Sequence, residues 1–187
     1  MPAGVLESEC YLGTPQERFK KDIIFVGSYG YHPEWNYRPQ LIDWLKNTYG
    51  DRFQRFAGDC KYGTIRGGAL NDLYASAKVV IGDSLCIGFN YPHYISDRLF
   101  ETTGRGGFII FPYIVGIGNY FKLGSELITY DYGDFDSLKK LIDFYVNNNE
   151  EREKIQIAGH RRTKKDHTYR NRIEKIFSIL KEEGAIE

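Results

Sequence analysis

Short strands made only of apolar residues, each followed by small or polar residues and then a helix, constrain this chain most. Two of them are Ile23 to Val26, which ends at Gly27, and KVVIGDS at 78–84. A continuous apolar run of this length is typical of a parallel strand buried on both faces. Single strands that alternate with helices over most of the length predict an α/β fold with one doubly wound parallel sheet. In such a sheet ligands bind beyond the carboxyl ends of the strands, where the loops gather.

The most informative unit runs from Tyr94 to Pro112, where a helix leads through three glycines into the apolar strand Phe108 to Phe111. Its polar face carries Asp97 and Glu101, which are four residues apart and so lie one above the other. Like charges at this spacing repel by about 0.2–0.5 kcal/mol. A site for ligand hydroxyls explains them, because an ionised carboxylate can accept two bonds from a diol. The alternative is that Glu101 pairs with Arg105 and that Asp97 is solvated.

Composition restricts the class of protein. A length of 187 residues, with 42% hydrophobic and 27% charged residues, predicts one globular domain with its own core. A formal net charge of zero argues against a general nucleic-acid binder, whose contacts with phosphate need a basic excess. The three cysteines have neither metal-ligand nor redox spacing, which favours a reducing, cytoplasmic setting. We see no signal peptide, and the longest apolar run is too short for a membrane span.

The domain organisation follows from where the periodic pattern begins. Residues 1–21 have little periodicity and are expected to form an extended lead-in or an interdomain linker, followed by a Rossmann-like domain over 22–187. Beyond Glu150 the chain is predicted to be helical throughout, with one apolar stripe that includes Ile173 and Phe177.

Two loops are candidate nucleotide contacts. Gly27 and Ser28 end the first strand and would let a diphosphate approach the backbone, unless they form an ordinary turn. Arg38 lies near the start of the first helix, where a cation is unfavourable unless an anion is close. The loop that contains Ile65 and Arg66 is glycine-rich and open enough for a nucleobase, although a plain loop fits equally well. There is no GxGxxG motif and no P-loop lysine.

The other candidate residues flank the acidic helix. Arg98 would neutralise a leaving diphosphate, or else be solvated or paired with Asp97. His93, just before the helix, would contact a sugar hydroxyl or share a proton, or else be structural. His160 and His167 have no carboxylate cluster at ligand spacing, so no metal site is expected. No nucleophile motif of a hydrolase is present.

In order and spacing, five segments resemble the C-terminal, donor-binding half of a GT-B glycosyltransferase. More narrowly, they resemble the "glycosyl transferases group 1" domain of retaining family 4 enzymes and of spore-maturation-type glycosyltransferases. The segments are DIIFVGS with Arg38 following, LNDLYASAKVVIGDS, SDRLFETTGRGGFIIFPY, LITYDYGDFDSLKKLIDFYVNNNEEREKIQIAG and HTYRNRIEKIFSIL. The lead-in PAGVLESECYLGTP resembles the segment that joins the two halves in that family.

The resemblance implies roles for individual residues. Glu101 falls on the glutamate that accepts bonds from the ribose hydroxyls of a nucleotide sugar, and Arg98 on the arginine of the R-x-F-E form of that motif. Gly27 and Ser28 fall on the loop that faces the diphosphate, and Ile65 and Arg66 on the loop beside the base. Many retaining relatives have a second glutamate eight positions before the ribose one, where this chain has His93. Contact with the transferred sugar is then expected to pass to His93, Tyr94 or Asp97.

These roles imply a hexosyltransferase-like enzyme that transfers a glycosyl group, with retention, from a nucleoside-diphosphate sugar to an unknown acceptor. Neither a cofactor nor a metal is expected, because backbone amides, a helix N-terminus and arginines would stabilise the leaving diphosphate. A GT-B enzyme has two such domains, so an N-terminal acceptor domain or a partner subunit is expected, and this chain is a fragment, a subunit or a degenerate relative.

Two other functions stay open. The first is a non-catalytic interaction module that keeps the fold and uses the aromatic loop Tyr29 to Tyr37 as a partner surface. The second is a nucleotide-sugar epimerase, which the missing GxGxxG motif disfavours.

Overall fold

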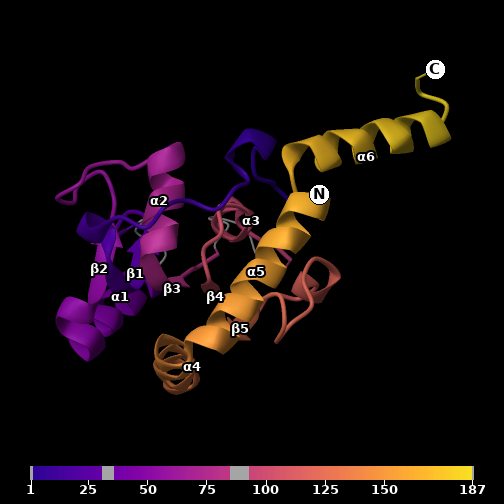
Figure 1. Cartoon of the computed structure of the whole chain (residues 1–187). Coiled ribbons are helices and arrows are strands. Elements are labelled where there is room, and N and C mark those ends of the chain that lie inside the picture. The colour runs from indigo at the N-terminus through magenta and orange to yellow at the C-terminus, as the bar shows by residue number, and fades with distance from the viewer. Residues whose placement is uncertain (1, 31–35, 85–92, 187) are drawn as a thin grey trace.

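A five-stranded parallel sheet forms the centre of the protein in a computed structural model that describes residues 2–30, 36–84 and 93–186 (Figure 1). The strand order is β2-β1-β3-β4-β5, and every neighbouring pair is parallel. The strands are β1 Lys21–Val26, β2 Phe53–Phe56, β3 Ala77–Ile81, β4 Ile109–Pro112 and β5 Ile128–Tyr130. This is the α/β, doubly wound, Rossmann-like fold that the apolar strands predict.

Helices cover both faces of the sheet. Successive residues of a strand point to opposite faces, so Phe25 packs with α1 (Tyr37–Tyr49) and α4 (Phe135–Asn147). Its neighbour Ile24 packs instead with α2 (Gly68–Ser76) and α3 (Asp97–Gly104). Burial on both faces explains why the strands are apolar throughout.

The α3 helix begins later than the sequence suggests and is followed by a tight turn. Ser96 is the residue before the helix and has extended backbone, so α3 starts at Asp97 and not at Tyr94. After the helix, Gly106 has φ +79°, and a Cβ there would collide with the side chain of Leu12 from the lead-in. A side chain at this position would therefore both strain the backbone and displace the lead-in.

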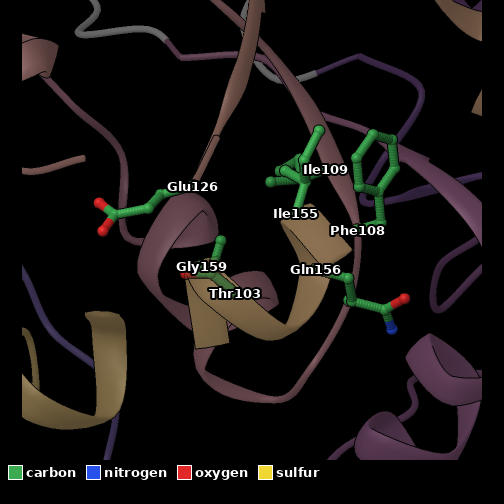
Figure 2. A pocket seen from close by; sticks show the side chains of 8 residues that line it. Thr103, Phe108, Ile109, Glu126, Ile155, Gln156 and Gly159 are labelled. Carbon is green, nitrogen blue, oxygen red and sulfur yellow. The ribbon is translucent and has the colours of Figure 1, made fainter. Parts of the chain in front are cut away.

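The α5 helix (Asn149–Asp166) packs closely against α3 (Figure 2). The hydroxyls of Thr103 and Thr163 are 2.7 Å apart, and an added Cβ at Gly159 would lie 2.5 Å from the carbonyl oxygen of Glu126. The small pocket at this contact has no volume that a water molecule could occupy. It is a packing seam and not a binding site.

The C-terminal region is two helices, where the sequence predicts one continuous helical tail. The chain breaks after Asp166, and a capping box between Thr168 and Asn171 starts α6 (Tyr169–Glu182). Figure 1 shows α6 extending away from the sheet. Its apolar stripe, which includes Ile173 and Phe177, is exposed.

The lead-in contacts the domain along most of its length. It contains two short 3-10 helices, Glu7–Glu9 and Glu17–Phe19. Val5 forms a parallel bridge with Thr168, and the Asn71 side chain donates to the carbonyl oxygens of Glu9 and Tyr11 at 2.9 and 2.7 Å. Its role as an interdomain linker stays a prediction. Two further 3-10 turns are Gly50–Arg52 and Ile117–Asn119.

Candidate functional site

The strand order reverses between β1 and β3, because β2 lies beyond β1 whereas β4 lies beyond β3. In a doubly wound sheet of order 2-1-3-4-5 this reversal opens the ligand crevice at the carboxyl ends of the two strands. Gly27 and Ser28 follow β1 there, and Asp83 follows β3. A Cβ at Gly27 would lie 2.8 Å from Nη2 of Arg98, so this loop needs a glycine beside the arginine.

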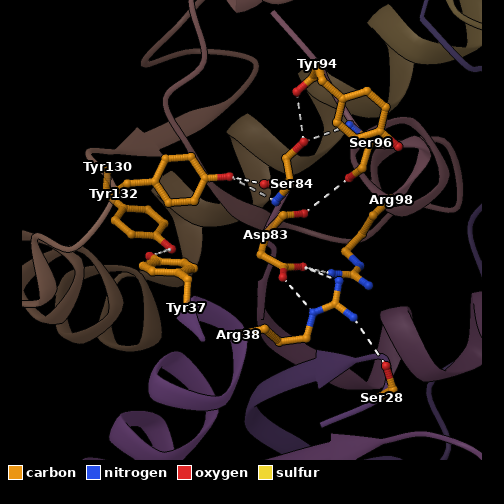
Figure 3. Close-up of polar contacts among 10 residues, drawn as sticks. All are labelled: Ser28, Tyr37, Arg38, Asp83, Ser84, Tyr94, Ser96, Arg98, Tyr130 and Tyr132. Atoms are coloured by element: carbon orange, nitrogen blue, oxygen red, sulfur yellow. Dashed lines mark hydrogen bonds and ion pairs between the residues drawn. The ribbon is translucent and has the colours of Figure 1, made fainter. Parts of the chain in front are cut away.

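Asp83 is a buried carboxylate that holds two arginines at this crevice (Figure 3). Arg38 donates from Nε to Oδ2 at 2.7 Å and from Nη2 to Oδ1 at 3.2 Å. Arg98 forms a second ion pair with Oδ1, and Arg38 also donates from Nη1 to Ser28 Oγ at 3.3 Å. Both guanidinium groups lie next to the Gly27–Ser28 loop, where Arg38 bonds to Ser28 and Arg98 lies against Gly27. Because guanidinium groups donate charge-assisted hydrogen bonds, this corner of the crevice is suited to binding an anion.

The position of Arg38 near a helix start indicates that an anion lies close to it, and in the structure Asp83 is such an anion. Asp83 is not among the site residues predicted from the sequence. Arg98, for which solvation or pairing with Asp97 was the alternative, pairs with Asp83 instead. The available signal was KVVIGDS, in which a carboxylate directly follows a buried strand. The sequence does not show that two arginines reach this carboxylate. Arg38 comes from α1, 45 residues upstream, and Arg98 from α3, 15 residues downstream.

Hydrogen bonds fix the start of α3 relative to β3. Ser84 Oγ donates to the carbonyl of Tyr94 at 2.9 Å and accepts from the amide of Ser96 at 3.0 Å. Ser96 Oγ in turn donates to the carbonyl of Asp83 at 3.2 Å. The Tyr132 hydroxyl also bonds to the backbone of Ser84, so this junction is tied to the segment after β5 as well (Figure 3).

Glu101, one turn further along α3, lines an open pocket of about 440 Å³. Asp97 and Arg98 lie along the same pocket, and Ile65 and Arg66 line it from the glycine-rich loop. Five of the predicted site residues therefore meet at one cavity. Burial and the neighbouring charge of Asp97 raise the pKa of the Glu101 carboxyl above its usual value.

Arg105 does not neutralise Glu101 through an ion pair. Its guanidinium is buried and donates from Nη1 to Asn71 Oδ1 at 2.6 Å and to the carbonyl of Gly67 at 3.1 Å, while Nη2 pairs with Glu9. Among the residues that the structure describes, the Glu101 carboxylate has no hydrogen-bond or ion-pair partner. The alternative pairing of Glu101 with Arg105 is therefore not what the structure has, and the carboxylate faces the pocket as an available acceptor.

His93 lines a second pocket, of about 420 Å³, together with Tyr94 and Asp97. Asp97 borders both pockets, so the two pockets are neighbours. The His93 ring is exposed and its Nδ1 lies 3.0 Å from the carbonyl oxygen of Val115. Nδ1 is a donor when it bonds to a carbonyl, which leaves the other ring nitrogen as an acceptor.

Two kinds of feature are not found in residues 2–30, 36–84 and 93–186. No three His, Cys, Asp or Glu side chains gather there in a way that would hold a metal ion. None of the helices in these ranges has both the length and the apolar character needed to cross a membrane.

The sequence matches the model of one protein family, described as glycosyl transferase-like, over residues 26–178. The chain belongs to the glycosyl transferase-like family. The match covers the carboxyl ends of β1 and β3 and all of α3, so the site residues predicted from the sequence lie inside the matched range. No protein with a curated description matches the sequence.

Solved structures of glycosyltransferases share the fold. A sucrose-phosphate synthase from Thermosynechococcus elongatus superposes with a TM-score of 0.63 at 12% identity, over 98% of this chain and 52% of that one. A glycosyltransferase from Rickettsia africae gives 0.57 at 16% identity, over 97% and 48%. A pneumococcal O-GlcNAc transferase, GtfA, solved with UDP and GlcNAc, gives 0.53 at 14% identity, over 91% and 38%.

This glycosyl transferase-like chain spans about half the length, or less, of those structures. The family match and the shared fold confirm the resemblance to a C-terminal GT-B domain. The narrower, spore-maturation subgroup stays a prediction.

Proposed function

We propose that this domain binds the nucleotide-sugar donor of a glycosyltransferase and takes part in transferring the glycosyl group, with retention, to an acceptor held elsewhere. The observation that supports this most directly is the Glu101 carboxylate, half-buried beside a pocket of about 440 Å³ with no ion pair among the described residues. Burying a carboxylate without a partner costs free energy. A ligand with two adjacent hydroxyls would compensate that cost.

The donor would lie along α3. Residues 97–98, 101 and 105 recur at about one-turn intervals, roughly 5–6 Å apart along the helix. The diphosphate would lie at the first level, against Arg98 and the Gly27–Ser28 loop, and the ribose at the second, against Glu101. The base would lie at the third level, beside Ile65 and Arg66. This order matches the covalent order of a nucleoside diphosphate.

The same arrangement supports the chemistry of transfer. The bond between the anomeric carbon and the diphosphate oxygen breaks, and the diphosphate leaves with the electron pair. The acceptor hydroxyl oxygen bonds to the anomeric carbon on the face that the diphosphate leaves, which retains the configuration, and its proton passes to an oxygen of the departing diphosphate. The guanidinium groups of Arg98 and Arg38 beside the Gly27–Ser28 loop would stabilise the departing negative charge without a metal ion. His93 and Asp97 would contact the transferred sugar, since both line the adjoining pocket.

Calorimetry with uridine, guanosine, adenosine and thymidine diphosphates tests this proposal. We expect at least one of them to bind, and Glu101→Ala to weaken it by about tenfold or more, since a hydrogen bond to a charged group contributes about 1.5–3 kcal/mol. Glu151→Ala, at an exposed glutamate of α5, is the matched control and should leave binding unchanged. Unchanged binding by Glu101→Ala would contradict the assignment of the ribose site.

The alternative, an interaction module without catalytic activity, predicts that none of the four nucleotides binds. Part of its partner surface, residues 31–35 of the aromatic loop, lies outside the described residues. The calorimetry above distinguishes the two functions, because only the donor site requires a nucleotide.

A further inference from the structure

The base end of the nucleotide pocket contains an acidic group from the lead-in. Glu9 lines the same pocket as Glu101, although it is 92 positions earlier in the sequence. Its carboxylate pairs through Oε2 with Arg105, the residue that follows α3 and lies about one turn beyond Glu101. Arg105 also donates to the carbonyl of Gly67, in the loop beside the expected base. Glu9 is therefore at the third level of the pocket, next to the base loop.

One oxygen of this carboxylate is available to a ligand. Oε2 is used by Arg105, whereas Oε1 accepts no hydrogen bond from any residue in the described parts of the chain. The Glu9 side chain is 26% exposed, so the carboxylate is reachable from the pocket. Its position is fixed, because Asn71 donates through Nδ2 to the Glu9 carbonyl at 2.9 Å, and Asn71 Oδ1 accepts from Nη1 of Arg105 at 2.6 Å.

We propose that Glu9 makes this site selective for guanosine diphosphate donors, which rests on the proposed function above. A carboxylate is an acceptor only. Guanine is the one common base that presents two adjacent donors on one edge, the ring N1–H and the exocyclic N2 amine. Uracil and thymine place a single N–H between two carbonyl oxygens, and adenine and cytosine place an acceptor nitrogen beside their amine. Guanine can donate N1–H and its 2-amine to the free Oε1 and to the remaining lone pair of Oε2, whereas each of the other bases brings a lone pair against one of these two oxygens.

Arg105 and Asn71 would act as positioning residues in this scheme. They would hold the Glu9 carboxylate in place without touching the base. The guanidinium of Arg105 bonds to Glu9 in the lead-in, to Asn71 in α2 and to Gly67 in the base loop. A site with fixed polar groups discriminates strongly against a ligand that leaves them unpaired. The lead-in would then contribute a residue to the donor site in addition to its expected role as an interdomain linker.

Calorimetry on the intact chain with guanosine, inosine, uridine and adenosine diphosphates tests the proposal without any variant. We expect guanosine diphosphate to bind at least tenfold more tightly than the uridine and adenosine compounds. Inosine diphosphate lacks the 2-amine but keeps N1–H, and should bind with intermediate affinity. Equal or tighter binding of uridine or adenosine diphosphate would overturn the selectivity and leave the donor-site proposal intact. If none of the four binds, the proposed function itself fails.

The variant Glu9→Gln assigns the selectivity to this residue. The amide of this variant keeps an oxygen for Arg105 and replaces the free acceptor with a donor. The affinity for guanosine diphosphate should therefore fall about tenfold, and the preference for guanosine diphosphate over inosine diphosphate should shrink. Glu7→Gln, in the same 3-10 turn and paired with exposed Arg170, is the matched control and should bind as the wild type does. A guanosine preference that survives in a folded Glu9→Gln protein would overturn the role of Glu9.

Discussion

The Glu101 carboxylate is destabilised by its surroundings in the folded protein. Burial and the charge of Asp97 raise the pKa of its carboxyl, so the folded state favours the protonated form. The stabilising contribution of this group is therefore present at low pH and is lost as pH rises through the raised pKa. Binding of a diol has the opposite dependence, because it needs the ionised acceptor.

Glu101→Gln should consequently stabilise the empty protein at pH 7 by about 0.5 kcal/mol, since it removes the repulsion from Asp97. Urea unfolding of the variant and the wild type between pH 4 and 7 measures this. The difference in free energy of unfolding should grow with pH above the ordinary value of 4.5 for a glutamate. A difference that shrinks as pH rises would mean that Glu101 has a stabilising cationic partner.

Gly27 is constrained by both its backbone and its neighbour. Its φ is +153°, and an added Cβ would lie 2.8 Å from Arg98 Nη2 and 3.1 Å from the Phe25 ring. We expect Gly27→Ala to cost about 1–3 kcal/mol in urea unfolding and to weaken nucleotide binding. Gly30→Ala is the control, because no atom of residues 2–30, 36–84 or 93–186 lies within 4 Å of a Cβ there. Equal stability of the two variants would show that the loop relaxes freely.

At the level of elements, the Asp83 ion pairs join α1 and α3 to the end of β3. Asp83→Asn would leave two largely buried arginines with less compensation, and we expect a loss of about 3–5 kcal/mol in the free energy of unfolding. Glu17→Gln breaks an exposed ion pair with Lys20 and should cost no more than about 1 kcal/mol. Similar losses in both variants, measured by urea unfolding, would contradict the structural role of Asp83.

The packing seam between α5 and α3 allows a test at Gly159, where helix propensity and close packing have opposite effects on stability. Alanine usually stabilises a helix by about 1 kcal/mol relative to glycine. At Gly159 the new Cβ would lie 2.5 Å from the backbone oxygen of Glu126, which cannot move easily. We expect the clash to dominate and Gly159→Ala to destabilise the protein by about 1–3 kcal/mol in urea unfolding. Ala158→Gly, a propensity control on the same helix, should cost about 1 kcal/mol; a stabilised Gly159→Ala would contradict the close packing.

The elements also show where sequence reasoning succeeds. Strands and helices with a strong apolar period were predicted within a few residues, because burial dictates their pattern. Contacts between distant segments were not predictable: neither the pairing of Arg98 with Asp83 nor that of Arg105 with Glu9 leaves a local signal. The break at His167 was missed since a capping threonine inside a helical pattern is a weak stop signal.

On the scale of the whole molecule, the sequence predicts the fold. It does not show whether this chain alone contains every residue needed for glycosyl transfer. Alternating strands and helices fix a doubly wound sheet, and that topology places the crevice at the ends of β1 and β3. The chain matches 52% or less of the solved glycosyltransferases described above. We therefore expect the isolated domain to bind a nucleotide and to transfer little or no sugar. Measurable transfer to a simple acceptor by this chain alone would contradict the need for a second domain.

The central claim is that the Glu101 carboxylate binds a ribose diol, and a double-mutant cycle by calorimetry tests it most directly. The tightest-binding nucleoside diphosphate and its 2′,3′-dideoxy analogue would be titrated into the wild type and into Glu101→Ala. Our account predicts that the wild type loses about tenfold or more in affinity for the dideoxy compound, and that Glu101→Ala binds both compounds equally weakly. If removal of the hydroxyls costs the same in both proteins, Glu101 does not contact them and the account is wrong.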